Sequence, residues 1–318
     1  MSEQIPVGVS SCLLGNAVRY DGGHKRDRYI TDTLATYFTF VPVCPEVECG
    51  LPVPREPMRL VAAEGDPVRL VTVRTGLDLT ERMETWCQRR ADELVTENLC
   101  GFIFKKDSPS SGLHRVKLYH PSGHSSRREG RGLFAEAVTR RFPLMPVEEE
   151  GRLNDAQLRE NFIERVFAMK RWRDFLADDP DYKKLIGFHT AQKFLVLAHH
   201  PEKYREMGQL VARGKEVPPD ELLTTYGQLY LKSLEAFATV KKNTNVLQHM
   251  MGYFRDYLTP DEKAELLEII DAYHAHLVPL IVPLTLLKHY VRKYDVEYLR
   301  DQVYLSPHPA ELMLRNHV

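Results

Sequence analysis

The sequence has few cysteines, few tryptophans, no excess of charge of either sign and no long apolar run. Its 318 residues include five cysteines and two tryptophans, and 43 Lys and Arg balance 44 Asp and Glu. A hydrophobic fraction of 43% is typical of an ordinary soluble globular protein, which excludes a wholly disordered chain and a fibre. A chain of this length has room for about two domains.

The apolar and cysteine patterns exclude two further classes. The most apolar stretch, residues 277–287, is too short to span a membrane and contains Pro279 and Pro283, so we expect no membrane partner. The cysteines form no Cys-x-x-Cys pair, and their odd number does not suit a disulfide framework. We therefore expect a cytoplasmic protein with free thiols, some of which serve as metal or cluster ligands.

Charge is also balanced within each half of the chain. Residues 1–150 carry 20 basic and 21 acidic side chains, and residues 151–318 carry 23 of each. Because neither half is a basic domain, a nucleic-acid partner would depend on a local basic patch. The sequence does not indicate an oligomeric state.

The first half alternates short β-rich runs with helical patterns. The runs cover residues 6–9, 40–43, 68–73 and 101–104. A helical pattern at residues 83–95 lies between the last two, and Cys87 falls on its apolar stripe, so we expect this thiol in the core. The alternation predicts an α/β N-terminal domain with a largely parallel sheet.

The second half has helical patterns almost to its end. It follows the acidic run at residues 148–150. We expect an α/β domain over residues 1–150 and an all-α helical C-terminal domain over residues 151–318. The expected helices cover about residues 155–176, 183–199, 202–213, 219–240, 243–257, 261–276 and 280–293.

Three of the predicted strands end in small polar or thiol residues followed by a turn. Cys12 follows the first strand, Cys44 follows the second, and the loop 108–112 follows the fourth. Because the carboxyl ends of parallel strands meet at one edge of a sheet, these residues are predicted to lie close together. The alternative is that both cysteines are small buried core residues.

Five blocks of the first half, within about residues 5–145, form a recognisable set. The blocks are Ser10–Gly15, Arg19–Gly23, Val43–Val47, Gly50–Pro57 and Lys106–Gly112. They resemble the signature of the thiouracil desulfidase family and occur in the family's order. The resemblance implies a [4Fe-4S] cluster held by three cysteines, with its fourth iron open to the sulfur of a thiolated pyrimidine. By position, Cys12 and Cys44 carry over as ligands.

The third ligand position departs from this pattern. The family has Ser-Pro-Ser-Cys-Gly in the last block, whereas this chain has Ser111 at the cysteine position. A serine hydroxyl is a harder and more basic donor than the thiolate that normally binds iron–sulfur clusters. Ser111 therefore indicates a substituted and impaired site, whether natural or engineered, or a chain that recruits Cys49 or Cys100 instead.

Glu46 is the best candidate for acid–base chemistry, because it comes two residues after Cys44 and follows a proline. Ser11 and Ser110 are candidates to donate hydrogen bonds to the cluster or the substrate. The alternatives are a solvated glutamate and serines that only cap a turn. A hydrolase with a cysteine nucleophile is a weaker possibility, because no histidine falls in a motif that pairs with Cys12 or Cys44.

Five pieces of the second half also form a recognisable pattern, at residues 159–167, 189–193, 243–249, 280–290 and 307–316. They resemble a YbgA-like domain over nearly all of residues 152–318, although Gln192 stands where histidine is usual. The two-domain arrangement is similar to tRNA 4-thiouridine desulfidases, in which the helical domain is assigned to RNA binding.

Basic clusters beside aromatic and amide side chains support an RNA partner, because such groups suit phosphates and unstacked bases. One cluster surrounds Trp172, and another leads into the stretch 243–249. The alternative is that these side chains form solvated helix faces. The candidate RNA contacts are Lys170, Arg171, Arg173, Lys193, Lys241, Lys242, Asn245, Gln248 and Lys288.

Together these features predict a cytoplasmic desulfidase that converts 4-thiouridine in tRNA to uridine by non-redox, iron–sulfur-assisted hydrolysis. The first domain would carry the chemistry and the second would hold the RNA, with the target base flipped out of its stack. Two alternatives remain open. One is a desulfidase of free thiouracil or a thionucleoside, and the other is a non-catalytic RNA-binding protein that has lost the cluster.

Overall fold

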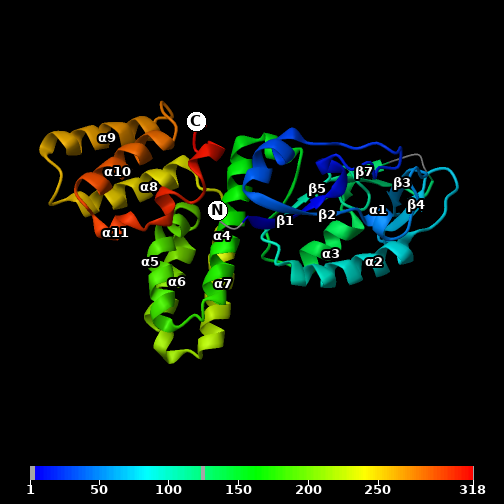
Figure 1. Ribbon diagram of the computed structural model, residues 1–318, viewed down its shortest axis with the longest axis horizontal. Coiled ribbons are helices and arrows are strands. Elements are labelled where there is room, and N and C mark those ends of the chain that lie inside the picture. The colour runs from blue at the N-terminus through cyan, green and yellow to red at the C-terminus, as the bar shows by residue number, and fades with distance from the viewer. Residues whose placement is uncertain (1–3, 123–125, 318) are drawn as a thin grey trace. The chain divides into compact units, whose positions relative to one another are not determined.

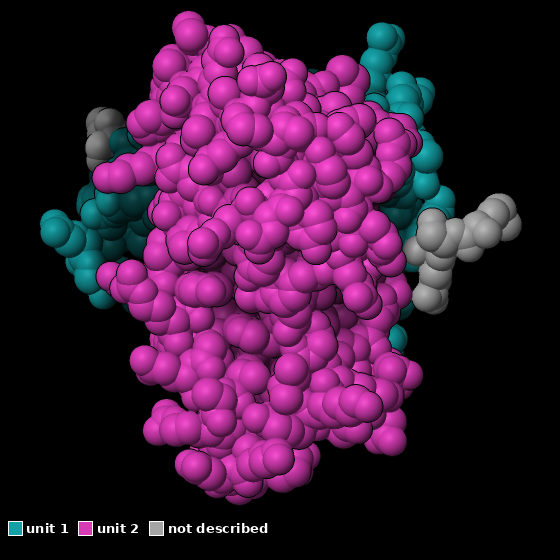
Figure 2. Space-filling view, turned by 90° about the vertical axis from the view of Figure 1, so that its left-hand side faces the viewer, with its two compact units in different colours: residues 1–155 teal, residues 156–318 magenta. Residues whose placement is uncertain are grey.

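The computed structural model describes residues 4–122 and 126–317 and divides into two compact units, residues 1–155 and 156–318 (Figure 2). The acidic run at residues 148–150 belongs to the first unit, where Val147–Glu149 forms strand β8. The division therefore falls five residues beyond the predicted boundary at residue 150.

The first unit contains a parallel four-stranded sheet in the order β2-β1-β5-β8. Strand β1 (Ile5–Ser10) pairs with β2 (Phe38–Val43) on one side and with β5 (Phe102–Phe104) on the other, and β5 pairs with β8. This confirms the predicted α/β fold with a parallel sheet. The chain continues from β1 to β2 on one side of β1 and later enters β5 on the other side. The topological switch point of the sheet therefore lies between β1 and β5.

A second sheet of the first unit has the order β4-β3-β6-β7. Its strands are β3 (Met58–Val61), β4 (Arg69–Thr72), β6 (Val116–Tyr119) and β7 (Ser126–Gly130). The run predicted at 68–73 does form a strand, β4. The expectation that it joins the parallel sheet is wrong, because it lies in the second sheet. The connection from β3 is too short for a crossover and turns through Gly65 at φ +85°, so β4 pairs antiparallel to β3.

Helices α2 (Thr80–Glu93) and α3 (Leu133–Arg141) pack against each other (Figure 1). The Trp86 and Phe134 rings lie 5.4 Å apart at their contact. Cys87 is buried in the same core, which confirms its predicted position. The short helix α1 (Pro45–Glu48) follows β2 directly.

The second unit is built of helices, as predicted (Figure 1). The helix expected at 219–240 is wrong in its length, because the chain leaves the helix after Ser233 and begins α8 at Val240. The backbone carbonyls of this connection pair with side chains instead of continuing the helix. Ala236 O contacts His199 Nδ1, and Phe237 O accepts from Lys242 Nζ. The helices are α4 (Ala156–Ala177), α5 (Tyr182–His199), α6 (Pro201–Ala212), α7 (Pro219–Ser233), α8 (Val240–Met251), α9 (Pro260–His274), α10 (Ile281–Lys293) and α11 (Glu297–Arg300).

A buried ionic network connects α4, α5 and the C-terminal tail. Glu164 Oε1 lies 2.5 Å from His199 Nε2, and Glu164 Oε2 accepts from Arg315 Nη2 at 3.1 Å. Burial by itself raises the pKa of Glu164, but the charge and hydrogen bond of His199 and then the charge of Arg315 outweigh it and hold this pKa well below its ordinary value. Within the described ranges, no helix is both long and apolar enough to cross a bilayer.

Candidate active site

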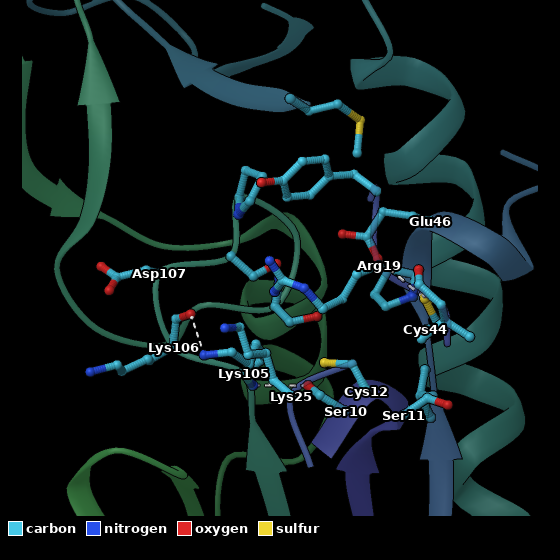
Figure 3. A pocket seen from close by; sticks show the side chains of 18 of the residues that line it. Ser10, Ser11, Cys12, Arg19, Lys25, Cys44, Glu46, Lys105, Lys106 and Asp107 are labelled. Carbon is cyan, nitrogen blue, oxygen red and sulfur yellow. Dashed lines mark hydrogen bonds between the residues drawn. The ribbon is translucent and has the colours of Figure 1, made fainter. Parts of the chain in front are cut away.

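Three segments that are distant in the sequence meet around a cavity of about 350 Å³ in the first unit (Figure 3). Cys12 follows β1, Cys44 follows β2, and the loop at 105–111 follows β5. This is the carboxyl edge of the parallel sheet, where the sequence placed them. The lining also includes polar and charged groups: Ser10, Ser11, Arg19, Lys25, Glu46, Arg55, Lys105, Lys106, Asp107, Ser108 and Ser111.

The two cysteines at the cavity are buried thiols. Burial raises the pKa of Cys12 to about 11, and the charge of Lys105 offsets part of that effect. Burial raises the pKa of Cys44 to about 12, and the negative charge of the nearby Glu46 adds to this effect. These thiols hold their protons at neutral pH, and binding of a metal centre would release them because the thiolate is the ligand.

Glu46 is held between the serine loop and an arginine. Ser110 Oγ donates to Glu46 Oε1 at 2.5 Å, while Glu46 Oε2 lies 3.4 Å from Cys44 Sγ and 3.7 Å from Arg55 Nη2. The guanidinium of Arg55 also donates to Val18 O at 3.0 Å. Sequence reasoning overlooked Arg55, although it stands inside the block 50–57.

The loop after β5 is fixed by hydrogen bonds within itself and to helix α3. Ser108 Oγ accepts from the backbone N–H of Ser111 at 3.1 Å, and Ser110 O accepts from Phe134 N at 2.8 Å. A Cβ on Gly132 would lie 2.4 Å from Ser110 C, so this glycine allows the loop to approach the start of α3. The contacts leave Ser111, which is 3% exposed, in the wall of the cavity.

The other candidates for a third ligand do not line this cavity. Cys49 Sγ donates to Glu46 O at 3.3 Å and packs against the core. Cys100 lies just before β5, where its backbone N–H donates to Pro6 O, so it belongs to the amino end of the sheet. Neither Cys49 nor Cys100 therefore lies at the cavity that Cys12 and Cys44 line. The three positions that the family resemblance assigns to ligands, Cys12, Cys44 and Ser111, all line the cavity.

Two further serines of the lining, Ser10 and Ser11, have hydrogen-bond partners within the first unit. Ser11 Oγ accepts from Asn16 Nδ2 at 2.8 Å, so it already has a partner in its own loop. Ser10 Oγ accepts from Lys105 N at 2.9 Å and thereby ties the end of β1 to the end of β5. The ammonium of Lys105 forms an ion pair with Glu150.

Several of the candidate RNA-binding residues in the second unit have structural partners. Trp172 is only 6% exposed and stacks on Phe175, so its indole is not presented to a base. Arg171 Nη1 donates to Pro307 O at 2.7 Å. Lys170 forms an ion pair with Asp174, and Lys242 donates to the carbonyls of His199 and Phe237. Lys288 is half-buried, and burial lowers its pKa. Arg173, also half-buried, lies one residue beyond Trp172 on α4.

The other candidates lie at the surface. Lys241, Asn245 and Gln248 are exposed on one face of α8, at helical spacing. The half-buried Lys193 places its ammonium 4.7 Å from the centre of the Tyr298 ring, which stacks on Tyr253. These residues remain predictions as RNA contacts.

Comparisons with known proteins match each unit separately. Residues 7–150 match the model of the 2-thiouracil desulfurase family, and residues 193–309 match a domain of unknown function, DUF1722. The chain belongs to the 2-thiouracil desulfurase family. It carries the family's domain in its first unit and the DUF1722 domain in its second.

Two curated proteins and one solved structure resemble parts of this family member. YbgA of Escherichia coli (strain K12) is 29% identical over 165 residues, which is 52% of this chain and 98% of YbgA. YbbK of Bacillus subtilis (strain 168) is 33% identical over 109 residues, which is 33% of this chain and 71% of YbbK. The [4Fe-4S]-dependent thiouracil desulfidase TudS is 31% identical, with a TM-score of 0.38, and the match covers 48% of this chain and 95% of TudS.

Proposed function

We propose that this chain is a hydrolytic desulfidase of thiolated uracil that uses a [4Fe-4S] cluster. The observation that carries the proposal is the meeting of Cys12, Cys44, Ser111 and the Glu46–Ser110 pair around one cavity. Membership of the 2-thiouracil desulfurase family and the [4Fe-4S] dependence of TudS support the same chemistry.

The donor set fits an iron–sulfur cluster at two positions and departs from it at the third. Cys12 and Cys44 would supply two thiolates, and Ser111 would supply an oxygen ligand. When bound, a cluster with an open iron supplies a Lewis acid for the sulfur of the thiocarbonyl. Because an oxygen donor suits this iron less well than a thiolate, we expect this chain to bind the cluster more weakly than a three-cysteine site.

Glu46 would accept a proton in the cavity, and Ser110 would hold its carboxylate in position. The reaction adds water at the carbon of the C=S bond and releases the sulfur as hydrosulfide, so the nucleophilic water must lose a proton. Glu46 Oε1 and Oε2 lie at the cavity as the acceptor for that proton, and Arg55 compensates the negative charge of the carboxylate. Ser110 is fully buried behind the lining, and its hydroxyl holds the carboxylate in place instead of facing a substrate.

Anaerobic reconstitution tests the ligand set. We expect the native chain to take up less iron and sulfide than Ser111→Cys, and to desulfurate 2-thiouracil and 4-thiouridine more slowly. Cys12→Ala and Cys44→Ala should abolish uptake, whereas Cys49→Ala should not, because Cys49 lies outside the lining. Uptake of no cluster even by Ser111→Cys would refute the proposed enzyme and favour an RNA-binding protein that has lost the cluster.

We also propose that the substrate is 4-thiouridine within tRNA and that the helical unit holds the RNA. The exposed face of Lys241, Asn245 and Gln248 on α8 supports this role, because it combines a cation with two amides at one surface. Free thiouracil or a thionucleoside is the rival substrate, since TudS acts on thiouracil.

The two substrates are distinguished by comparing the full chain with residues 1–155. We expect the shortened chain to keep activity on free 4-thiouridine and to lose affinity for thiolated tRNA in a filter-binding assay. The triple variant Lys241→Ala, Asn245→Ala, Gln248→Ala should weaken tRNA binding in the full chain. Unchanged tRNA affinity and turnover after truncation would refute the RNA-holding role of the helical unit.

A further inference from the structure

A separate cavity, of about 250 Å³, lies within the second unit, and we call it the helical-unit cavity. It is formed by the start of α4, the start of α8, the connection between α9 and α10, and the C-terminal tail. Four of the five pieces of the YbgA-like pattern each contribute one residue to its lining: Glu160, Asn243, Leu280 and Arg315. Segments that are far apart in the sequence therefore meet at a site for which the proposed reaction has no use.

The buried part of the helical-unit cavity is polar and firmly held. Asn243, Tyr273 and Arg315 line it and are each at most 6% exposed. Asn243 Oδ1 accepts from the hydroxyl of Tyr304 at 2.9 Å. Arg315 donates through Nη1 to Tyr304 O and through Nη2 to Glu164 Oε2. These contacts fix the amide and the guanidinium before any ligand arrives.

One donor and one acceptor of this lining face each other without a hydrogen bond. The buried Nε of Arg315 has no hydrogen-bond partner, and Glu160 Oε1 lies 3.5 Å from it, beyond the usual range of about 2.7–3.2 Å. The other carboxylate oxygen, Oε2, lies 2.7 Å from His317 Nε2. Buried polar atoms without a partner are rare in native proteins. A ligand that carries an acceptor beside a donor would satisfy both groups.

The charges and the apolar walls of the lining indicate a neutral, flat ligand. With its histidines neutral, the described lining has one negative side chain, Glu160, and one positive, Arg315, and these charges cancel. A phosphate or a metal ion would bring an uncompensated charge to this buried place. Tyr273 and four aliphatic side chains supply apolar contacts. A nucleobase meets these requirements, because each base is a planar ring with a donor beside an acceptor on its edge.

The helical-unit cavity adjoins the face of α8 that the proposed function assigns to RNA. Val240 and Asn243, in the first turns of α8, line the cavity, whereas Lys241 and Asn245 on the same helix are exposed. A base in the cavity leaves its sugar and phosphates near the start of α8. The positive charge of Lys241 and the helix dipole both favour a negative group there. A free nucleoside offers the same ring but has no phosphate for this place.

We propose that the helical-unit cavity captures one unpaired base of a bound RNA, separate from the base that is desulfurated in the first unit. This inference rests on the proposed function, because it takes RNA as the ligand of the helical unit. Arg315 would donate to the acceptor on the edge of the base, Glu160 would accept from the neighbouring N–H, and Tyr273 would contact the ring. Because every base has such an edge, this capture does not depend on the sequence of the RNA.

Fluorescence anisotropy with two short probes tests the proposal on the full chain. The probes are fluorescein-labelled hexauridylate and a labelled hexamer of abasic ribose phosphates, which has the same backbone and no bases. We expect hexauridylate to bind at least about ten-fold more tightly, as is typical of a stacked base. Ala238→Phe, which adds a ring to the lining, should remove most of this difference. Uridine should displace hexauridylate only at concentrations well above those of unlabelled hexauridylate.

Ala275→Phe is the matched control for Ala238→Phe. It introduces the same side chain at an exposed position after α9 that is not part of the lining, so the difference between the two probes should persist. Glu160→Gln is a second test that preserves the volume of the cavity. It removes the carboxylate acceptor and should reduce the difference several-fold. Circular dichroism checks that each variant keeps its helices.

Equal binding of the two hexamers would overturn the base site. A difference that neither Ala238→Phe nor Glu160→Gln changes would overturn it as well. Uridine that competes as well as unlabelled hexauridylate would overturn the RNA source and assign the cavity to a free nucleoside. The proposed function is tested separately, because a loss of tRNA affinity in residues 1–155 would still support the RNA-holding role of the helical unit.

Discussion

At the scale of single residues, the site depends on a carboxylate whose two oxygens have different neighbours. Glu46 Oε1 faces the hydroxyl of Ser110, while Oε2 faces Cys44 Sγ and Arg55. Position in the sequence was enough to single out Glu46, because it follows a strand-end cysteine by two residues. Arg55 could not be singled out, because its role comes from a contact between two loops that no local pattern encodes.

Glu46→Gln should remove proton acceptance while preserving the shape of the site. In the Ser111→Cys background, we expect turnover of 4-thiouridine to fall by about 10²- to 10⁴-fold, the usual contribution of a general base. Iron and sulfide content should stay unchanged, because Glu46 is not among the proposed ligands. Glu81→Gln, an exposed position on α2, serves as the control. Activity within a few-fold of the parent would exclude Glu46 as the base.

At the scale of elements, strand ends were predictable and the second sheet was not. The β-rich runs before Cys12, Cys44 and Ser108 follow one another with crossovers between them, which is sufficient to place their carboxyl ends together. Residues 69–72 have the same local pattern as a parallel strand. Their pairing depends on the short turn at Gly65, so the local pattern did not distinguish the two sheets.

In the second unit, the local sequence pattern of helix α4 did not predict which of its side chains are buried. Its buried residues include Phe162, Ile163 and Glu164 in succession, so the helix is covered on several sides. A helix of this kind has no single solvated face, and charged side chains near Trp172 therefore find protein partners instead of water. The indole of Trp172 is buried and is not presented to a base, while Lys170, Arg171 and Arg173 stay predictions as RNA contacts.

The contact between the serine loop and α3 can be tested through Gly132. In Gly132→Ala, the added methyl group would meet the Ser110 backbone at 2.4 Å, so the loop must move. We expect a loss of about 1–3 kcal/mol in the free energy of unfolding, as is typical of overpacking. Iron uptake should also decrease, because Ser111 moves with the loop.

Gly208→Ala is the matched control for Gly132→Ala. Nothing lies within 4 Å of the added Cβ, and the residue is inside helix α6. It should stabilise the chain by about 0.5–1 kcal/mol, because alanine is the better helix former. Urea unfolding and iron analysis measure both variants. Normal iron uptake and unchanged stability in Gly132→Ala would show that this close approach does not position the site.

At the scale of the whole molecule, the two units have separate cores, and each core contains one of the two tryptophans. Trp86 is buried in the first unit and Trp172 in the second. The scarcity of tryptophan therefore gives a selective optical probe. In Trp86→Phe, the remaining indole reports unfolding of the helical unit alone.

The free energy of unfolding of the helical unit should fall in two pH ranges as acid is added. Burial lowers the pKa of His189 from 6.5 to about 4, so the unfolded chain binds an extra proton between these values and stability falls as pH decreases from 6.5 towards 4. The pKa of Glu164 lies below its ordinary value of 4.5, because the charges of His199 and Arg315 outweigh burial. Its contribution is complete above pH 4.5 and is lost below it.

Glu164→Gln separates the two stages. At neutral pH the variant leaves Arg315 and His199 without their buried carboxylate, so we expect a loss of about 3–5 kcal/mol in the free energy of unfolding. In urea titrations followed by Trp172 fluorescence, the fall in stability between pH 6.5 and 4 should remain, since His189 causes it. The further fall below pH 4.5 should be absent. Glu268→Gln, exposed on α9, should keep both stages. An unchanged acid profile in Glu164→Gln would mean that other carboxylates of the helical unit control its stability in acid.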